Sequence, residues 1–267
     1  MSAPQYPGPA RIQLVATDVD GPLLGPDHRI PAPRARAVRR LQEAGIPVIL
    51  ATGKIWTSIR PIWEQLELSG PHVTCNGAAV VAGTGQVIAR APLATDIATE
   101  LVAELCRRRV AHALYLDDGS LITSNRVAAL DIITEMGEPE PTVAGIDGRR
   151  VLKVLAVVGE AEEGDLRGFA TAADALTQRT GPRFLEWNAP NTQKATGLRV
   201  AAKHLGIDLA SVVAIGDAEN DIPMLRTAGC GVAVADASSV ARGAADLVLR
   251  DDLAGYLDAV AAAATPG

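Results

Sequence analysis

The sequence of 267 residues lacks the marks of several protein classes. Its three cysteines, Cys75, Cys106 and Cys230, are widely spaced and odd in number, so neither a disulfide framework nor a zinc site is expected. No apolar run reaches the length of about 18 residues that is needed to span a bilayer. Residues 1–10 lack the apolar stretch of a secretory signal peptide. We therefore expect a cytoplasmic protein that does not bind a membrane.

An excess of positive charge is also missing. The net charge of -6 and the pI near 5.3 argue against nucleic acid or an anionic membrane as the main partner. The four histidines are scattered and show no metal-ligand spacing. The length leaves room for one large domain or for two smaller ones.

Short apolar strands alternate with helices near both ends of the chain. Strands are predicted at residues 12–17, 46–51, 72–75, 211–215 and 231–234, and helices at 33–44, 55–66, 191–205 and 221–228, with a last helix near the end. This alternation indicates right-handed parallel units in a doubly wound, Rossmann-like α/β sheet.

The middle of the chain has a different pattern. Hairpins mix with helices there, and we predict a strand at 151–158, a helix at 164–180 and a strand at 183–187. An α+β domain at residues 83–188 is therefore expected to be inserted into an α/β core formed by residues 1–82 and 189–267.

Two acidic clusters follow two of the apolar strands. Asp18 and Asp20 follow the strand at 12–17, and Asp217 and Asp221 follow the strand at 211–215. Open α/β sheets carry their chemistry at the carboxyl ends of strands. Paired carboxylates in such a place would repel one another unless a divalent cation neutralised them. Asp221 alone could equally be a helix N-cap, but the set together predicts a Mg²⁺ site.

Two further groups point to phosphate. Thr52 and Gly53 lie between a strand and a helix, where a hydroxyl and free N–H groups can hold a phosphate, although such a pair is often only an N-cap. Lys194 lies in the first turn of the helix at 191–205, where a cation opposes the helix dipole. A bound anion explains that lysine better than a solvated surface position does.

These motifs together resemble, in order and position, the four motifs of the haloacid dehalogenase superfamily. They are DVDG at 18–21, TG at 52–53, Lys194 and GDAEND at 216–221. The large insert and the CNGA segment at 75–78 are similar to the Cof-type sugar-phosphatase branch of that superfamily. The resemblance covers residues 12–252 and implies a Rossmann-like core with an α+β cap.

The resemblance also implies an activity and a role for each residue. It implies a Mg²⁺-dependent phosphatase that hydrolyses a small phosphorylated metabolite, such as a sugar phosphate, through an aspartyl-phosphate. Asp18 would be the nucleophile, and Asp20 would protonate the leaving alcohol and then activate water. The phosphate-binding residues would be Thr52, Gly53, Lys194 and Asn220, and the Mg²⁺ site would consist of Asp18, Asp20 through its backbone carbonyl, Asp217 and Asp221. A monomer or a homodimer is expected.

The sequence departs from the pattern of that branch at two positions. Pro22 stands where threonine is usual, and Lys54 stands where arginine is frequent. Two other functions remain open at this point. One is a phosphomutase, which needs the same aspartyl-phosphate but must exclude water. The other is a non-catalytic phosphoacceptor or ligand-binding module, for which Asp20 would have no purpose.

Overall fold

The computed structural model describes residues 11–125, 131–169, 174–180 and 183–264. A five-stranded parallel sheet forms the core, in the order β14-β13-β12-β1-β2. Its strands are β1 (Leu14–Thr17), β2 (Val48–Leu50), β12 (Val212–Gly216), β13 (Cys230–Ala233) and β14 (Leu247–Val248). All residues of β1 and β12 are buried, which explains why these strands are continuous apolar runs. The predicted parallel sheet is confirmed.

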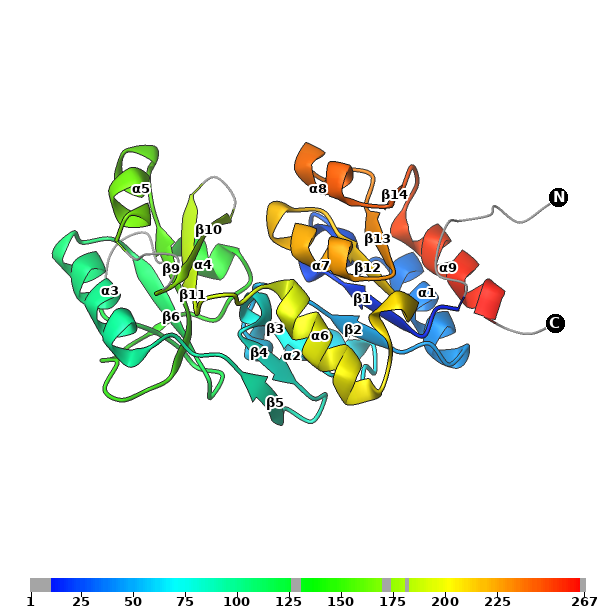
Figure 1. The fold of residues 1–267 in the computed structure, drawn as a ribbon, viewed down its shortest axis with the longest axis horizontal. Helices are drawn as coiled ribbons and strands as arrows, with labels where there is room; N and C mark the ends of the chain where they lie inside the picture. The colour runs from blue at the N-terminus through cyan, green and yellow to red at the C-terminus, as the bar shows by residue number, and fades with distance from the viewer. Residues whose placement is uncertain (1–10, 126–130, 170–173, 181–182, 265–267) are drawn as a thin grey trace.

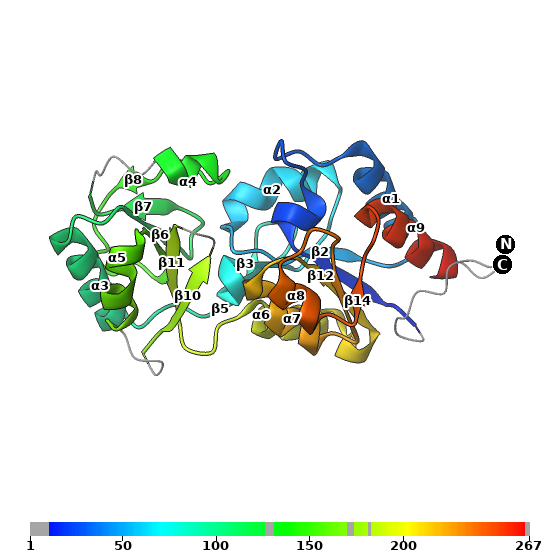
Figure 2. The same cartoon turned by 90° about the horizontal axis from the view of Figure 1, so that it is seen from above.

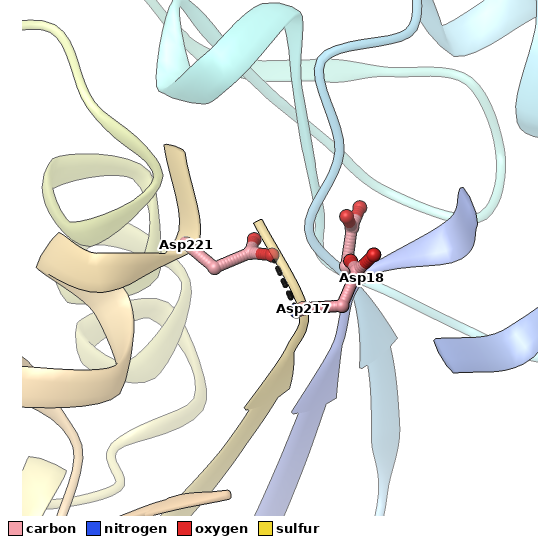
Figure 3. A group of neighbouring side chains, drawn as sticks. All are labelled: Asp18, Asp217 and Asp221. Atoms are coloured by element: carbon pink, nitrogen blue, oxygen red, sulfur yellow. Dashed lines mark hydrogen bonds between the residues drawn. The ribbon is translucent and has the colours of Figure 1, made fainter. Parts of the chain in front are cut away.

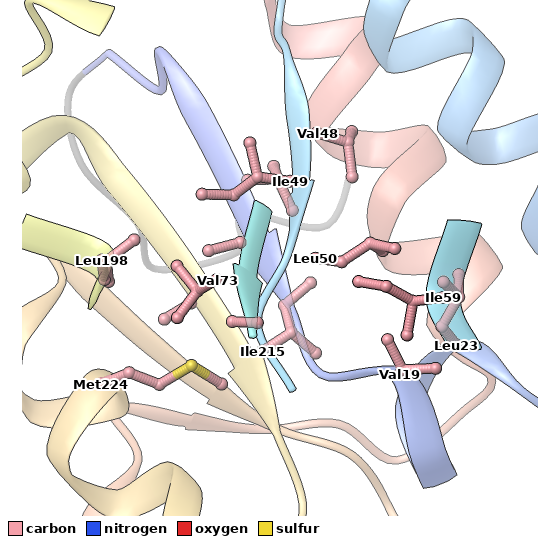
Figure 4. Close-up of a cluster of buried hydrophobic side chains, with 14 of the residues drawn as sticks. Val19, Leu23, Val48, Ile49, Leu50, Ile59, Val73, Leu198, Ile215 and Met224 are labelled. Atoms are coloured by element: carbon pink, nitrogen blue, oxygen red, sulfur yellow. The ribbon is translucent and has the colours of Figure 1, made fainter. Parts of the chain in front are cut away.

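Helices cover both faces of this sheet (Figures 1 and 2). On one face lie α1 (Ala32–Glu43), α2 (Trp56–Gln65) and α9 (Leu253–Ala264), and on the other lie α6 (Lys194–Leu205), α7 (Ile222–Thr227) and α8 (Ser239–Ala244). Aliphatic side chains such as Ile49 on β2 and Ile215 on β12 fill the space between the layers (Figure 4). The described helices include none with the length and apolar character needed to cross a bilayer.

An antiparallel three-stranded sheet extends the core beyond β2. It consists of β3 (His72–Thr74), β4 (Ala79–Val81) and β5 (Val87–Arg90), and a parallel bridge between Ala51 and Val73 joins it to the core. The turn between β3 and β4 packs against the start of α6. Gly77 in this turn has a φ of 97°, and a Cβ there would lie 2.1 Å from the Gln193 carbonyl oxygen, so only glycine fits.

A six-stranded sheet is built from the middle of the chain, in the order β10-β11-β9-β6-β7-β8. Its strands are β6 (His112–Leu116), β7 (Leu121–Thr123), β8 (Thr142–Val143), β9 (Val151–Val157), β10 (Leu176–Thr180) and β11 (Phe184–Asn188). The helices of this part of the chain are α3 (Thr95–Arg107), α4 (Asp131–Glu135) and α5 (Glu160–Arg167).

The two faces of this sheet have different partners. Leu114, Val154 and Trp187 on one face belong to a separate hydrophobic cluster that includes residues of α3 and α5. Tyr115 and Leu155 alternate with them and belong to the same cluster as the core. The second face is therefore the one that meets the α/β core.

The structure corrects one predicted element and adds several short ones. The helix predicted at 164–180 is wrong, because α5 ends at Arg167 and residues 176–180 form β10. The β10 segment pairs antiparallel with β11 along its whole length, and this tertiary pairing overrides the helical pattern. The short strands β8 and β14 and the short helices α4 and α8 were not predicted. The domain boundaries at 83 and 188 stay a prediction, and β5, which lies inside that range, pairs with β4.

His72 on β3 is a fully buried imidazole. Its Nδ1 accepts a hydrogen bond from the Leu50 N–H at 3.2 Å, and its ring stacks on Trp63 with centroids 4.8 Å apart. Burial lowers the pKa of His72 from 6.5 to about 4. In the unfolded chain the imidazole regains its ordinary pKa and takes up a proton first as the pH falls. His72 therefore costs stability as the pH falls from 6.5 towards 4.

We expect His72→Asn to remove this part of the acid sensitivity, because the Asn side-chain oxygen can take the place of Nδ1 as acceptor. Between about pH 7 and pH 5 the wild-type free energy of unfolding should fall by about 2 kcal/mol more than that of the variant. Urea unfolding followed by circular dichroism at the two pH values measures the difference. Equal losses in both proteins would show that His72 is not the titrating group.

Candidate active site

Asp18 lies directly after β1 and is buried. Its Oδ1 accepts a hydrogen bond from the Val19 N–H at 2.7 Å and lies 2.9 Å from Lys194 Nζ. Its Oδ2 accepts no hydrogen bond from the residues that the structure describes. Burial raises the pKa of Asp18 well above its ordinary value, with Lys194 opposing and Asp221 adding to the rise. One oxygen of this carboxylate is therefore held in place, and the other is available.

Lys194 is the first residue of α6 and is fully buried. A capping box in which Gln193 and Thr196 exchange hydrogen bonds starts the helix at this point. The ammonium contacts Asp18 Oδ1 at 2.9 Å and Asp221 Oδ1 at 2.7 Å. Burial alone would lower the pKa of Lys194, but the two carboxylates raise it above its ordinary value. A permanent cation thus joins the ends of β1 and β12.

Asp221 and Asp217 differ in how well their oxygens are satisfied. Asp221 Oδ2 accepts from the Asp217 N–H at 2.9 Å (Figure 3). It also accepts from the Ala218 N–H at 3.0 Å, and Oδ1 accepts from Lys194. Asp217 Oδ1, by contrast, is buried without a hydrogen-bond partner among the described residues. Burial, followed by repulsion from Asp221, raises the pKa of Asp217 from 3.8 to about 7.

The acidic residues fit a divalent cation with oxygen ligands. One oxygen from each of Asp18, Asp217 and Asp221 lies within 4.8 Å of the others. The backbone of Gly21, with a φ of 89°, comes so close that a Cβ there would lie 2.6 Å from Asp217 Oδ2. The unpartnered buried oxygen of Asp217 is what such a cation would satisfy.

The loop after β2 brings a hydroxyl to the same place. The Thr52 N–H donates to the Val73 carbonyl at 2.9 Å, and the Lys54 N–H donates to Thr52 Oγ1 at 3.1 Å. The Lys54 ammonium donates to the Met136 carbonyl and lies 3.4 Å from Asp20 Oδ1. The Asp20 side chain is about half exposed, unlike that of Asp18.

A cavity of about 290 Å³ lies between the ends of the parallel strands and the six-stranded sheet. All the residues predicted for the site line this cavity except Asp221. Asp221 instead accepts hydrogen bonds from two residues that line it, Asp217 and Lys194. The lining residues predicted from the sequence are Asp18, Asp20, Thr52, Gly53, Lys194, Asp217 and Asn220. Their roles in binding and catalysis stay predictions at this point.

The opposite wall of the cavity was missed in the sequence. It includes Tyr115, Glu138, Lys153 and Glu186, which come from the six-stranded sheet and the chain that follows α4. Two of these could have been found, because Lys153 and Glu186 are the only charges within the apolar stretches of β9 and β11. A lone charge in a buried strand needs a partner and marks a polar site.

The chain is similar to known hydrolases and phosphatases. A family model of haloacid dehalogenase-like hydrolases matches residues 15–257. A phosphoglycolate phosphatase from Methanopyrus kandleri is 34% identical over 238 residues, which cover 88% of this chain and 90% of that protein. An HMP-PP phosphatase from Serratia proteamaculans is 28% identical, with 84% of each chain covered.

Solved structures share the fold. A structure from Bacteroides thetaiotaomicron, described in a study of phosphatases of the haloalkanoate (HAD) superfamily, has a TM-score of 0.81 and 26% identity. The match covers 97% of this chain and 99% of that one. It therefore extends over the parallel core and the inserted sheet alike, and the predicted fold class is confirmed.

Proposed function

Because this chain belongs to the haloacid dehalogenase-like hydrolase family, we propose that it is a Mg²⁺-dependent phosphatase that hydrolyses a small phosphorylated metabolite through an aspartyl-phosphate. The predicted Cof-type family and its hydrolase class are confirmed. One observation carries the finer proposal. Asp18 keeps one oxygen fixed by Lys194 and the Val19 N–H while the other is available beside the cavity.

The proposed reaction has two displacements at phosphorus. Asp18 Oδ2 forms a bond to phosphorus while the bond to the substrate oxygen breaks, and Asp20 donates its proton to the leaving alcohol. Asp20 then accepts a proton from a water molecule that attacks the aspartyl-phosphate, so phosphate leaves and Asp18 is restored. The half-exposed position of the Asp20 side chain suits a group that exchanges protons with substrate and water.

Residues around Asp18 have donors left for the phosphoryl group. The ammonium of Lys194 carries three protons and uses two on Asp18 and Asp221, so the third can face a phosphoryl oxygen. Thr52 Oγ1 accepts from the Lys54 N–H, so its own hydrogen can be donated. We propose that these two groups, with Gly53 and the Asn220 amide, hold the phosphate.

For Mg²⁺ we propose ligands from Asp18, Asp217 and the backbone carbonyl of Asp20, with Asp221 orienting the loop. The orphaned oxygen of Asp217 supports this choice. The cation would neutralise the carboxylates and the charge of the phosphoryl group. Asp221 already has both oxygens occupied by Lys194 and by backbone N–H groups, which supports an indirect role.

We further propose that residues 83–188 act as a cap over the leaving-group side of the cavity. The face of the six-stranded sheet that carries Tyr115, Lys153 and Glu186 lines the cavity opposite Asp18, which supports this arrangement. A cap in that position would keep bulk water from the reacting groups during the first displacement.

A screen of phosphate esters tests the proposed function. Sugar phosphates, phosphoglycolate, pyridoxal phosphate and flavin mononucleotide are each incubated with the protein and Mg²⁺, and free phosphate is measured. We expect sustained release from at least one ester. Transfer of phosphate between two positions of a sugar without release would indicate a phosphomutase, and phosphorylation without turnover would indicate an acceptor module.

Pro22→Thr should raise kcat several-fold. Pro22 lies two residues after Asp20, is buried and has no N–H, whereas a threonine there could donate from its hydroxyl to orient Asp20. A hydrogen bond of about 1 kcal/mol corresponds to roughly a fivefold change in rate. Pro22→Ala is the matched control, because it restores the N–H without the hydroxyl. If the threonine and alanine variants have the same kcat, the hydroxyl has no such role.

A further inference from the structure

We propose that Lys153 is a positioning residue, which orients the Thr52 hydroxyl towards the substrate by fixing the peptide between Gly53 and Lys54. The inference rests on the proposed function, in which Thr52 holds a phosphoryl oxygen. Lys153 belongs to β9 of the inserted sheet and is 100 residues away from Gly53 in the sequence.

Lys153 is buried, with 2% of its side chain exposed, and its ammonium has three neighbours. It donates to the Gly53 carbonyl at 2.7 Å and to Glu186 Oε1 at 2.8 Å, and it lies 3.9 Å from the centroid of the Tyr115 ring. Two of these partners belong to the same sheet as Lys153. The Gly53 carbonyl alone belongs to the core.

The Gly53 carbonyl and the Lys54 N–H are the two ends of one planar peptide. Lys153 holds the carbonyl end, and the N–H end donates to Thr52 Oγ1 at 3.1 Å. Fixing the carbonyl therefore fixes the direction of the N–H. This N–H approaches Thr52 Oγ1 from one side, so the hydroxyl hydrogen must point in another direction. Thr52 lines the cavity, and the hydroxyl hydrogen can therefore point into it.

Glu186 holds the same loop from a second direction. Its Oε2 accepts from Asn76 Nδ2 at 2.6 Å, and the Asn76 N–H donates to the Thr52 carbonyl at 3.0 Å. Asn76 Oδ1 accepts from Asn220 Nδ2 at 3.2 Å. The buried pair of Lys153 and Glu186 thus reaches both proposed phosphate-binding segments, at Thr52–Gly53 and at Asn220.

A contribution to stability does not explain why Lys153 and Glu186 form a buried ion pair. Burying two charges costs free energy that their attraction only partly recovers, and well-packed apolar residues are often as stable. An apolar pair could not hold the Gly53 carbonyl or the Asn76 amide. The core groups that Lys153 and Glu186 contact are the Gly53 carbonyl, next to Thr52, and the Asn76 amide, whose oxygen accepts from Asn220. These contacts assign the pair to positioning.

The test is a double-mutant cycle with Thr52→Val. The variant K153M/E186Q removes both charges of the pair, so neither is left without the other, and the new glutamine can still accept from Asn76. We expect kcat/KM to fall by about 10- to 100-fold in this variant, as for a small misplacement of a binding group. In the Thr52→Val background the same two changes should cost less than about twofold, because the hydroxyl they orient is gone.

Trp187→Phe is the matched control. Trp187 is fully buried on the other face of the same sheet, so the change disturbs packing without touching the loop. Any loss it causes should be the same factor in the wild-type protein and in the Thr52→Val background. If circular dichroism shows K153M/E186Q to be unfolded, K153Q/E186Q replaces it, because its two neutral amides can bond to each other and a glutamine side chain is one bond shorter than that of lysine.

A second readout does not depend on turnover. The affinity for inorganic phosphate in the presence of Mg²⁺, measured by calorimetry, should fall in K153M/E186Q and in Thr52→Val and should fall no further when they are combined. Losses that multiply, in turnover and in phosphate affinity, would overturn the role of Lys153 while leaving the phosphatase intact. A wild-type protein that neither hydrolyses esters nor binds phosphate would overturn the proposed function and this inference together.

Discussion

Asp18→Asn should lower kcat by at least about a thousandfold, because the amide cannot attack phosphorus. The expected loss is large because no other group of the proposed site is in position to attack phosphorus once the carboxylate is removed. The amide oxygen can still accept from the Val19 N–H and from Lys194, so the local structure should be kept. Phosphate release from the best ester of the screen measures the effect.

The fold of this variant needs a separate check, because Asp18 is a buried partner of Lys194. Circular dichroism should match the wild type, and thermal unfolding should show no loss of stability. Asp221 still neutralises Lys194 at 2.7 Å, and the buried Asp18 carboxylate, whose pKa is raised, does not stabilise the fold when it is ionised. Retention of more than about 1% of the wild-type rate by a folded variant would mean that another group attacks phosphorus.

Removal of Mg²⁺ should abolish activity, and Asp217→Asn should raise the Mg²⁺ concentration for half-maximal activity by at least about tenfold. Losing one charged ligand weakens the hard-oxygen site. The titration of activity with Mg²⁺ after dialysis against EDTA measures both effects. Full activity of the wild type in EDTA would exclude the proposed metal site.

The same substitution should have the opposite effect on the metal-free protein. Burial and the nearby Asp221 raise the pKa of Asp217 to about 7, so ionised Asp217 costs stability above its ordinary pKa of 3.8. We expect Asp217→Asn to raise the metal-free free energy of unfolding by about 2–4 kcal/mol near pH 8. The gain should shrink as the pH falls below 7, because Asp217 then becomes protonated in the folded wild type.

Most of the core could be predicted because parallel strands that are buried on both faces are continuous apolar runs. The run before Asp18 and the run before Asp217 are both of this kind, and the shared edge of their strands brings the acidic residues together. The position of Lys194 at the start of a helix was also evident from the sequence. Each of these features is visible in a short stretch of sequence, and the pairing of two neighbouring strands is enough to bring the acidic residues together.

The opposite wall could not be predicted because it depends on contacts between distant residues. Asn76 and Glu186 are 110 residues apart, and nothing near either one indicates the other. The β10 strand could not be predicted for the same reason, because residues 176–180 form a strand only through pairing with β11. The alternation along β11 also decides which side chains reach the cavity, and it points Glu186 inwards and Trp187 away.

The most direct test of the proposed chemistry is to find the phosphoryl group on the enzyme. The protein is mixed with its best substrate and Mg²⁺, quenched in acid during turnover, and digested for mass spectrometry. We predict a phosphorylated peptide with the modification on Asp18, and no such peptide from Asp18→Asn. Phosphate on another residue, or rapid hydrolysis with no phosphorylated peptide at any time, would contradict a mechanism through Asp18.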